Sequence, residues 1–295
     1  MHRVLFLSHG HPELNKGGAE VASWNLFEAF KEAGHECLYV ARNDANAHGG
    51  STFSIRSEEE VLFHTGMSDW FCLSSSNTKH LFDDFGALVE SFKPTVIHMH
   101  HYAHIGIEVI AAARRAVPNA KIIFTLHEFM AMCLHNGQMV KTESLKLCYK
   151  ATHADCSSCF PHHTPADFFL RKSYILDQFS YVDEFVSPSL FLAERYIEWG
   201  IEKEKMHVIE NVLPAITALE PRALAKGEKR RKFAFFGQIN PYKGIDILLD
   251  AFAKLPEEIQ EIVTLDIHGA SLEHQTGELK DKVAKQIEAL GDIVT

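Results

Sequence analysis

The stretch FFGQINPYKGIDILLDAF, residues 235–252, places a lysine where an anion could bind. An apolar run ends at Gly237, a polar loop follows, and Lys243 and Gly244 precede a helical pattern. The start of a helix exposes unpaired backbone N–H groups and the positive end of the helix dipole, so phosphate groups bind there readily. The pattern therefore predicts that Lys243 sets its ammonium group beside a phosphate and that Gly244 allows close approach. A solvated surface lysine is the competing interpretation.

Histidines follow two apolar runs that are typical of buried strands. In VIHMHH, His98 and His100 alternate and so point to the same side of the strand, with His101 opposite. His127 and Glu128 follow a later apolar run, in TLHEF. Two strands that both end in histidine favour a functional site with His100 and His127 as candidate catalytic residues, although strand-end histidines are often structural. No nucleophile elbow or Ser/His/Asp order supports covalent hydrolysis.

Two adjacent glycines, Gly17 and Gly18, precede Ala19 and Glu20 at the predicted start of the first long helix. Glycines let the backbone approach a ligand closely and leave N–H groups available for an anion. A tight turn before a helix explains the same pair without any ligand.

Cysteines gather in one irregular segment, CLHNGQMVKTESLKLCYKATHADCSSCFPHH, residues 133–163. A C-x₂-C pair can grip one metal ion, and two more cysteines complete a tetrahedral sulfur set: Cys133, Cys148, Cys156 and Cys159. Structural zinc is therefore one hypothesis. Reduced thiols packed in a loop are a second, and an iron–sulfur cluster or redox pair is a third. Nearby histidines add further potential ligands: His153, His162 and His163.

Strand-like and helix-like segments alternate along the chain. Apolar runs predict strands at residues 3–10, 36–41, 95–100, 121–127, 184–189, 206–212, 232–237 and 264–269. Apolar residues at helical spacing predict helices around 22–33 and at 81–92, 105–116, 166–179, 189–199, 245–255 and 279–290. Residues 292–295 look like the opening of another strand.

This alternation predicts an α/β fold of parallel, doubly wound sheets, in which ligands bind outside the carboxyl ends of the strands. We expect an N-terminal domain at 1–213 with a Cys-rich insertion at about 133–163, a linker at 214–231 and a second domain at 232–295. The linker gathers charge in KGEKRRK, residues 226–232. This run is interpreted as solvated, with a nucleic-acid patch as the alternative.

Composition limits the function classes. The 295 residues carry a net charge of −10 with a pI near 6.0, so nucleic acid is not expected as the main partner. No segment approaches the roughly 20 continuous apolar residues of a membrane span, and the N-terminal apolar run is too short for a signal sequence. A cytoplasmic protein is expected. The stretch ADFFLRKSYILDQF, residues 166–179, predicts either packing of a helix on a sheet or peripheral contact with the inner face of a membrane.

Five motifs in order resemble the retaining GT-B glycosyltransferases of family 4: GGAE, VIHMHH, TLHEF, VSPS followed by G-x₆-HVIENV, and FFGQINPYKGIDILLDAF. The resemblance implies two Rossmann-like domains and transfer of a sugar, as in a hexosyltransferase. The donor would be a nucleotide diphosphate sugar of the UDP or GDP type. The acceptor would be a glycan or a lipid-linked molecule, as in polysaccharide biosynthesis, and no cofactor would be needed for the chemistry.

The resemblance also assigns individual residues. Lys243 matches the lysine that contacts the donor diphosphate, and Gln238 stands where the family commonly has an arginine, so that end of the site has no charge. Gly17 and Gly18 match the loop over the donor phosphates. His100 matches the histidine that reaches the transferred sugar, and His127 is a looser match. At the end of the last N-terminal strand, Asn211 matches the usual Asn-Gly, with a valine in place of the glycine.

One departure concerns the second domain. The family usually carries an E-x₇-E element there, and residues 232–295 contain no recognisable counterpart. Only 64 residues follow residue 231, so the second domain is expected to be incomplete. Two rival hypotheses follow: a nucleotide-sugar 2-epimerase of the same architecture, and a non-catalytic fragment that binds a nucleotide sugar or a partner.

Overall fold

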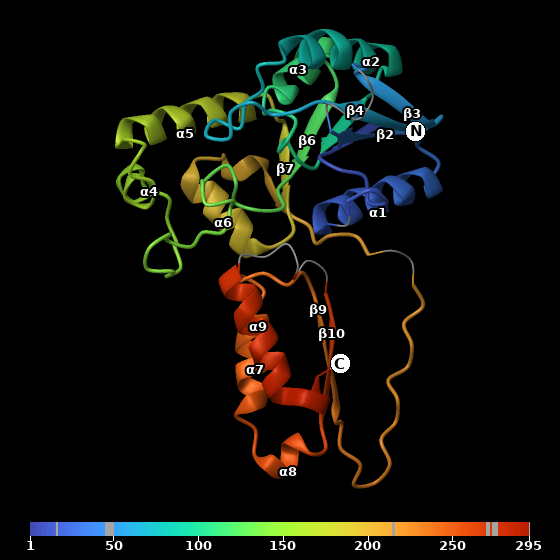
Figure 1. Ribbon diagram of the computed structural model, residues 1–295. Coiled ribbons are helices and arrows are strands. Elements are labelled where there is room, and N and C mark those ends of the chain that lie inside the picture. The colour runs from blue at the N-terminus through green and yellow to red at the C-terminus, as the bar shows by residue number, and fades with distance from the viewer. Residues whose placement is uncertain (16, 45–49, 214–215, 270–271, 273–276, 295) are drawn as a thin grey trace. The chain divides into compact units, whose positions relative to one another are not determined.

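The computed structural model (Figure 1) describes residues 1–15, 17–44, 50–213, 216–269, 272 and 277–294. The chain forms two compact units, Met1–Ile216 and Thr217–Thr295. Each is an α/β unit with parallel strands, which confirms the predicted fold class.

The first unit is built on an eight-stranded sheet with the order β3-β4-β2-β1-β5-β6-β7-β8. Neighbouring strands are parallel except for the antiparallel pair β3 and β4. The strands are β1 (Arg3–Ser8), β2 (Glu36–Asn43), β3 (Phe53–Ser57), β4 (Glu60–His64), β5 (Val96–Met99), β6 (Lys121–Thr125), β7 (Glu184–Ser187) and β8 (Met206–Val208). Strands β1, β5 and β6 are adjacent, so their carboxyl ends share one edge.

Helices cover both faces of this sheet (Figure 1). They are α1 (Gly18–Glu32), the π-helical η1 (Lys79–Phe85), α2 (Gly86–Phe92), α3 (Val109–Ala116), α4 (His153–Cys159), α5 (Pro165–Phe179), α6 (Leu190–Trp199) and the short 3-10 turn η2 (Lys203–Lys205). Strand β1 is a continuous apolar run because both of its faces are buried. Val4 and Phe6 pack with Phe27 of α1, whereas Leu5 and Leu7 join the larger core on the other face.

The second unit contains a parallel pair, β9 (Lys232–Phe236) and β10 (Thr264–His268). Its helices are α7 (Ile245–Ala253), α8 (Glu257–Gln260), α9 (Gly277–Leu290) and the 3-10 turn η4 (Gly291–Ile293). Leu249 and Phe252 of α7 pack with Leu265 and with Val283 of α9. An isolated parallel bridge joins Leu265 to Val294, at the place where the sequence predicts that another strand begins.

Several predicted boundaries shift for local reasons. The helix expected from residue 105 begins at Val109, because Gly106 has φ +114° and cannot continue a right-handed helix. The strand expected at 206–212 ends at Val208, because its partner β7 ends at Ser187, just before a proline that lacks a backbone N–H. The helix expected at 189–199 is confirmed, with the Ser189 hydroxyl accepting from the Leu192 N–H at 3.2 Å.

Among the described residues, several elements were not predicted: the two strands of the β3–β4 hairpin, α4 inside the segment interpreted as irregular, α8, and the short turn η2. Helix α5 buries Phe168, Ile175 and Phe179, as the packing interpretation requires, while Phe169 and Leu170 stay exposed. No helix in the described ranges is long and apolar enough to cross a membrane.

Candidate functional site

The carboxyl ends of β1, β5 and β6 bring together a cluster of histidines. His9 follows β1, His100 and His101 follow β5, and His127 follows β6. The ring centroids of His9 and His101 lie 4.2 Å apart. His100 Nδ1 lies 3.0 Å from His127 Nε2, a hydrogen-bonding distance. Both histidines predicted as catalytic residues therefore meet at one sheet edge.

The two differ in exposure. His100 is 2% exposed and stacks on His98, whose Nε2 lies 2.7 Å from the Thr125 hydroxyl. His127 is only partly buried. His100 thus lies on the buried side of the pair.

The clustered imidazoles are neutral at physiological pH. Burial lowers the pKa of His9 and of His127 to about 4 and that of His98 to about 3. Burial, followed by repulsion from neighbouring histidines, also holds the pKa of His100 well below its ordinary value. A neutral imidazole has one donor and one acceptor nitrogen, so this edge offers hydrogen bonds of both kinds without positive charge.

Glu128 joins the cluster through His101. The Ala103 N–H donates to His101 Nδ1 at 2.9 Å, which places the His101 proton on Nε2, 3.5 Å from Glu128 Oε1. The Met130 N–H donates to Glu128 Oε2. Burial raises the Glu128 pKa to about 8 despite that backbone hydrogen bond, so the carboxyl holds its proton over much of the neutral range.

The Glu20 side chain explains why a glycine is needed at one of the two predicted positions. A Cβ on Gly17 would lie 2.3 Å from Glu20 Oε2, so the space that a side chain would need is filled by this carboxylate. A Cβ on Gly18 would meet nothing within 4 Å. Glu20 is buried, burial raises its pKa, and its Oε1 lies 3.2 Å from His9 Nε2.

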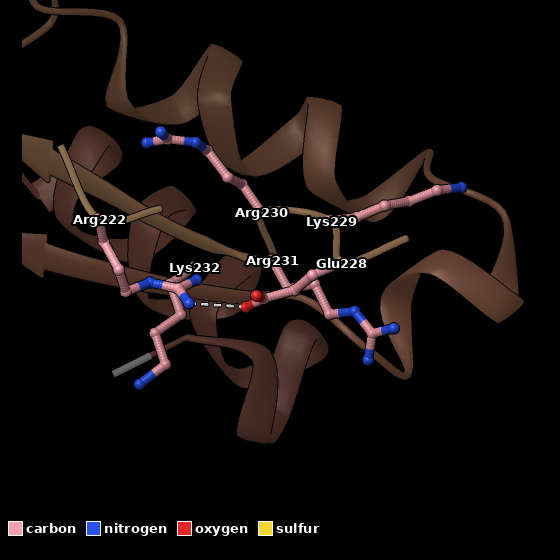
Figure 2. A pocket seen from close by; sticks show the side chains of 6 residues that line it. All are labelled: Arg222, Glu228, Lys229, Arg230, Arg231 and Lys232. Atoms are coloured by element: carbon pink, nitrogen blue, oxygen red, sulfur yellow. Dashed lines mark ion pairs between the residues drawn. The ribbon is translucent and has the colours of Figure 1, made fainter. Parts of the chain in front are cut away.

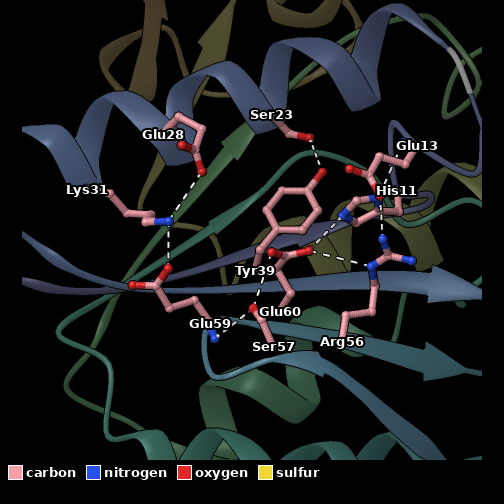
Figure 3. Close-up of polar contacts among 10 residues, drawn as sticks. All are labelled: His11, Glu13, Ser23, Glu28, Lys31, Tyr39, Arg56, Ser57, Glu59 and Glu60. Atoms are coloured by element: carbon pink, nitrogen blue, oxygen red, sulfur yellow. Dashed lines mark hydrogen bonds and ion pairs between the residues drawn. The ribbon is translucent and has the colours of Figure 1, made fainter.

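Polar contacts hold the loop after β1 against the β3–β4 hairpin (Figure 3). His11 Nε2 lies 3.2 Å from Glu60 Oε2, and Arg56 pairs with both Glu13 and Glu60. This loop carries His9 toward α1, so the unpredicted hairpin helps to position the histidine cluster.

In the second unit, Lys243 and Gly244 stand where the sequence predicts. Gly244 is the N-cap of α7 with φ +73°, a left-handed conformation that favours glycine. Lys243 is exposed and, within the described ranges, forms no salt bridge. The turn before it is closed by the Asn240 side chain, which accepts from the Tyr242 N–H at 3.0 Å. Gln238 is also exposed, just beyond the end of β9.

The charged stretch before β9 lines an open pocket of about 650 Å³ (Figure 2). Its lining consists of Arg222, Glu228, Lys229, Arg230, Arg231 and Lys232. Arg222 and Glu228 form an ion pair at 2.8 Å, and Figure 2 shows the other cationic side chains pointing away from one another. This divergence fits a solvated stretch.

The four cysteines of the insertion line one small cavity, together with Met132, His135 and Phe160 among others. All are free thiols. Burial raises the pKa of the Cys156 thiol to about 12. As the side chains stand, no three His, Cys, Asp or Glu residues of the described chain are grouped so that they could hold a metal ion.

Sequence reasoning missed His9, Glu20 and the pairing of Glu128 with His101. His9 could have been found, because it follows a strand as His100 does. Glu20 could not, because only the folded chain shows that its carboxylate turns back onto Gly17.

Solved structures share this fold. Anabaena HepE, in a complex with UDP and glucose, is 16% identical with a TM-score of 0.59, over 100% of this chain and 68% of that one. Sucrose-phosphate synthase from Thermosynechococcus elongatus is 16% identical with a TM-score of 0.62, over 100% and 70%. The lipopolysaccharide outer core galactosyltransferase WaaB, in its apo form, is 14% identical with a TM-score of 0.54, over 99% and 67%.

A comparison with curated protein sequences found no match. Two family profiles do match the chain. The profile of Glycosyl transferases group 1 matches residues 217–292 in the second unit. The profile of Glycosyltransferase Family 4 matches residues 16–214, which is more than half of the sequence. The chain therefore belongs to glycosyltransferase family 4.

Proposed function

We propose that this protein transfers a sugar, as a hexosyltransferase, from a nucleotide diphosphate sugar to a glycan or lipid-linked acceptor, with retention of configuration. Family membership supports sugar transfer. The UDP and glucose bound by Anabaena HepE, which shares the fold, support a UDP-type donor, with GDP as the alternative.

The observation that carries the proposal is the position of Lys243. It is an exposed cation one residue before the left-handed N-cap of α7. The first N–H groups of a helix lack partners within the helix and attract anions. Lys243 and this helix start together suit a diphosphate, and Gln238 adds hydrogen-bonding capacity without charge.

The histidine cluster supports the sugar part of the proposal. Sugar hydroxyls both donate and accept hydrogen bonds, and neutral imidazoles offer both functions. The resemblance gives the sugar contact to His100, but that ring is only 2% exposed. We therefore assign contact with the sugar to the partly exposed His127, and the positioning of its ring to His100. In a retaining transfer of this kind, the donor β-phosphate takes the acceptor proton on the face from which it departs. No protein nucleophile and no metal ion is then required for the chemistry.

Binding of nucleotides tests the phosphate assignment. UDP, GDP and ADP are titrated calorimetrically into the chain, into Lys243→Ala and into Lys254→Ala, which removes an exposed lysine at the other end of α7. We expect one nucleotide to bind, with a loss of about 1–3 kcal/mol in Lys243→Ala alone. Equal affinities in all three proteins would overturn the assignment.

Turnover distinguishes transfer from its rivals. The chain is incubated with the nucleotide sugar of the preferred class, with and without glycan and lipid-linked acceptors, and products are followed by NMR. A glycoside with the anomeric configuration of the donor supports the proposal. An inverted product refutes retention, turnover to a different nucleotide sugar without acceptor indicates an epimerase, and binding without turnover indicates a binding module.

A lipid-linked acceptor would bring the protein to a membrane surface. Phe169 and Leu170 are exposed near the start of α5, with exposed fractions of 54% and 62%. We expect the chain to float with anionic vesicles and the double variant Phe169→Ser/Leu170→Ser to float less. Equal flotation would remove these two side chains from any membrane contact.

A further inference from the structure

The cavity in the Cys-rich segment has a volume of about 20 Å³. About 10–15 Å³ is enough for one water-sized guest, so the cavity has room for a single ion. Its walls carry four thiols and are otherwise largely apolar, with Met132, Met139, Val140 and Phe160 among the lining residues. Such a setting suits a soft metal ion held by sulfur better than it suits water.

Three separate pieces of backbone bring the thiols together. Cys133 lies in the turn after β6, where its carbonyl accepts from the Gly137 N–H at 3.0 Å. Cys148 returns to the same place because its N–H donates to the Met139 carbonyl at 2.7 Å, beside the antiparallel bridge between Val140 and Leu147. Cys156 and Cys159 lie on α4 at i and i+3, and therefore on one face of the helix.

The segment carries backbone strain. Three non-glycine residues have left-handed conformations: Asn136 (φ 47°), Met139 (φ 50°) and Leu145 (φ 53°). Each such residue costs on the order of 1 kcal/mol or more. Leu145 and Leu147 are themselves exposed, so the turn between Val140 and Leu147 buries little apolar surface that could offset the strain. A metal–thiolate cluster would supply the missing stabilisation.

Two cations act electrostatically on the thiols. The positive charge of Arg171 attracts the thiolate forms of Cys133 and Cys156, and the Lys141 ammonium attracts those of Cys148 and Cys159. A divalent ion held by four thiolates has a net charge of −2, which these neighbours would partly neutralise.

We propose that Cys133, Cys148, Cys156 and Cys159 bind one structural Zn²⁺ ion. Four thiols lose their protons to solvent as four Zn–S bonds of about 2.3 Å form, with no change of oxidation state. Because no three potential ligands of the described residues are grouped to hold an ion as the side chains stand, binding requires the cysteine side chains to rotate. The ion would connect α4 and the turn between Val140 and Leu147 to the segment that continues from His127 and Glu128.

Metal analysis tests the proposal independently of catalysis. The full chain is produced with zinc and reductant, and its metal content is measured by mass spectrometry. Apo protein is then titrated with CoCl₂. We expect one zinc per chain and the intense visible bands of tetrahedral cobalt thiolate. Cys133→Ser and Cys156→Ser should lose both signals, whereas Cys37→Ser and Cys72→Ser, outside the cavity, should keep them.

Each other outcome overturns the proposal. Zinc-free protein whose six cysteines all react as thiols after zinc loading would show that these are packed reduced thiols. Loss of two or four reactive thiols without metal would indicate disulfides, and iron would indicate an iron–sulfur cluster. If Cys156→Ser fails to fold, Cys148→Ser and chelator-induced unfolding of the parent chain carry the test instead.

Discussion

Replacing Arg171 by methionine is expected to destabilise the first unit by about 3–5 kcal/mol. Arg171 is 2% exposed, and its guanidinium donates to three backbone carbonyls. Nε donates to Phe71 O at 2.5 Å, Nη2 to Met130 O at 2.7 Å, and Nη1 to Ala131 O. One side chain thus donates hydrogen bonds to the carbonyls of two loops that are distant in sequence.

The magnitude follows from those three bonds. A buried carbonyl that loses its donor costs about 1–3 kcal/mol, so the three together set an upper range of about 3–9 kcal/mol. Two of the three bonds are only partly buried, which places the loss toward the lower end. Methionine fills much of the same volume and avoids the desolvation of a buried cation, which offsets part of this loss. A net loss of about 3–5 kcal/mol is large beside the total stability of a domain, about 5–15 kcal/mol.

Urea unfolding followed by circular dichroism measures the effect. The matched control is Lys172→Met, which removes the neighbouring cation; Lys172 Nζ lies 5.6 Å from the centroid of a Trp199 ring, a contact worth about 0.5–1 kcal/mol. A loss below about 1 kcal/mol in Arg171→Met would refute the idea that one buried and two partly buried carbonyls depend on this guanidinium.

Four further substitutions test the sites. Gly17→Ala should destabilise the first unit, because its Cβ would lie 2.3 Å from Glu20 Oε2 and would push this buried carboxylate away from His9. Gly18→Ala should be neutral or slightly stabilising. Thermal melts compare the two variants, and equal shifts would contradict the packing argument. Gly244→Ala should cost about 1 kcal/mol, because φ is +73°, and should weaken nucleotide binding; a calorimetric affinity equal to that of the parent would count against the role of this turn. The pKa of the Glu128 carboxyl is about 8 in the folded state and ordinarily 4.5. Between these two pH values the folded state binds more protons than the unfolded state. The stability that this group contributes is therefore lost as the pH rises toward 8. Glu128→Gln should therefore gain stability relative to the parent between pH 5 and pH 8 in urea titrations, and a constant difference would show that the group titrates normally.

Much of the fold could be predicted because its strands are buried on both faces. Continuous apolar runs such as RVLFLS need no partner to be recognised, and the strand-end rule then leads directly to His100 and His127. The position of Lys243 and Gly244 could be predicted for a different reason, because β9 is mostly exposed. A strand, a glycine and a helix start adjoin there within one short stretch.

What the sequence did not reveal depends on contacts between distant residues. The β3–β4 hairpin turns at Glu58-Glu59, which carries none of the usual glycine or asparagine turn signals. Helix α4 is only seven residues long and too short for periodicity, although Thr152 and Asp155 form a cap that a local search would have found. The tight space at Gly17 is created by a side chain three positions away, and no spacing rule predicts that.

The contact between His100 and His127 fixes the direction of a hydrogen bond. Two neutral rings joined through Nδ1 and Nε2 leave opposite functions on their other nitrogens. His100 Nε2 is buried and has no partner among the described residues, and a buried acceptor without a partner is tolerated more readily than a buried N–H. The proton between the rings therefore belongs to His100 Nδ1, which makes Nδ1 of His127 a donor. A molecule that contacts this ring would therefore need a hydrogen-bond acceptor, such as an oxygen lone pair. The buried Nε2 of His100, on the far side of the pair, determines this requirement.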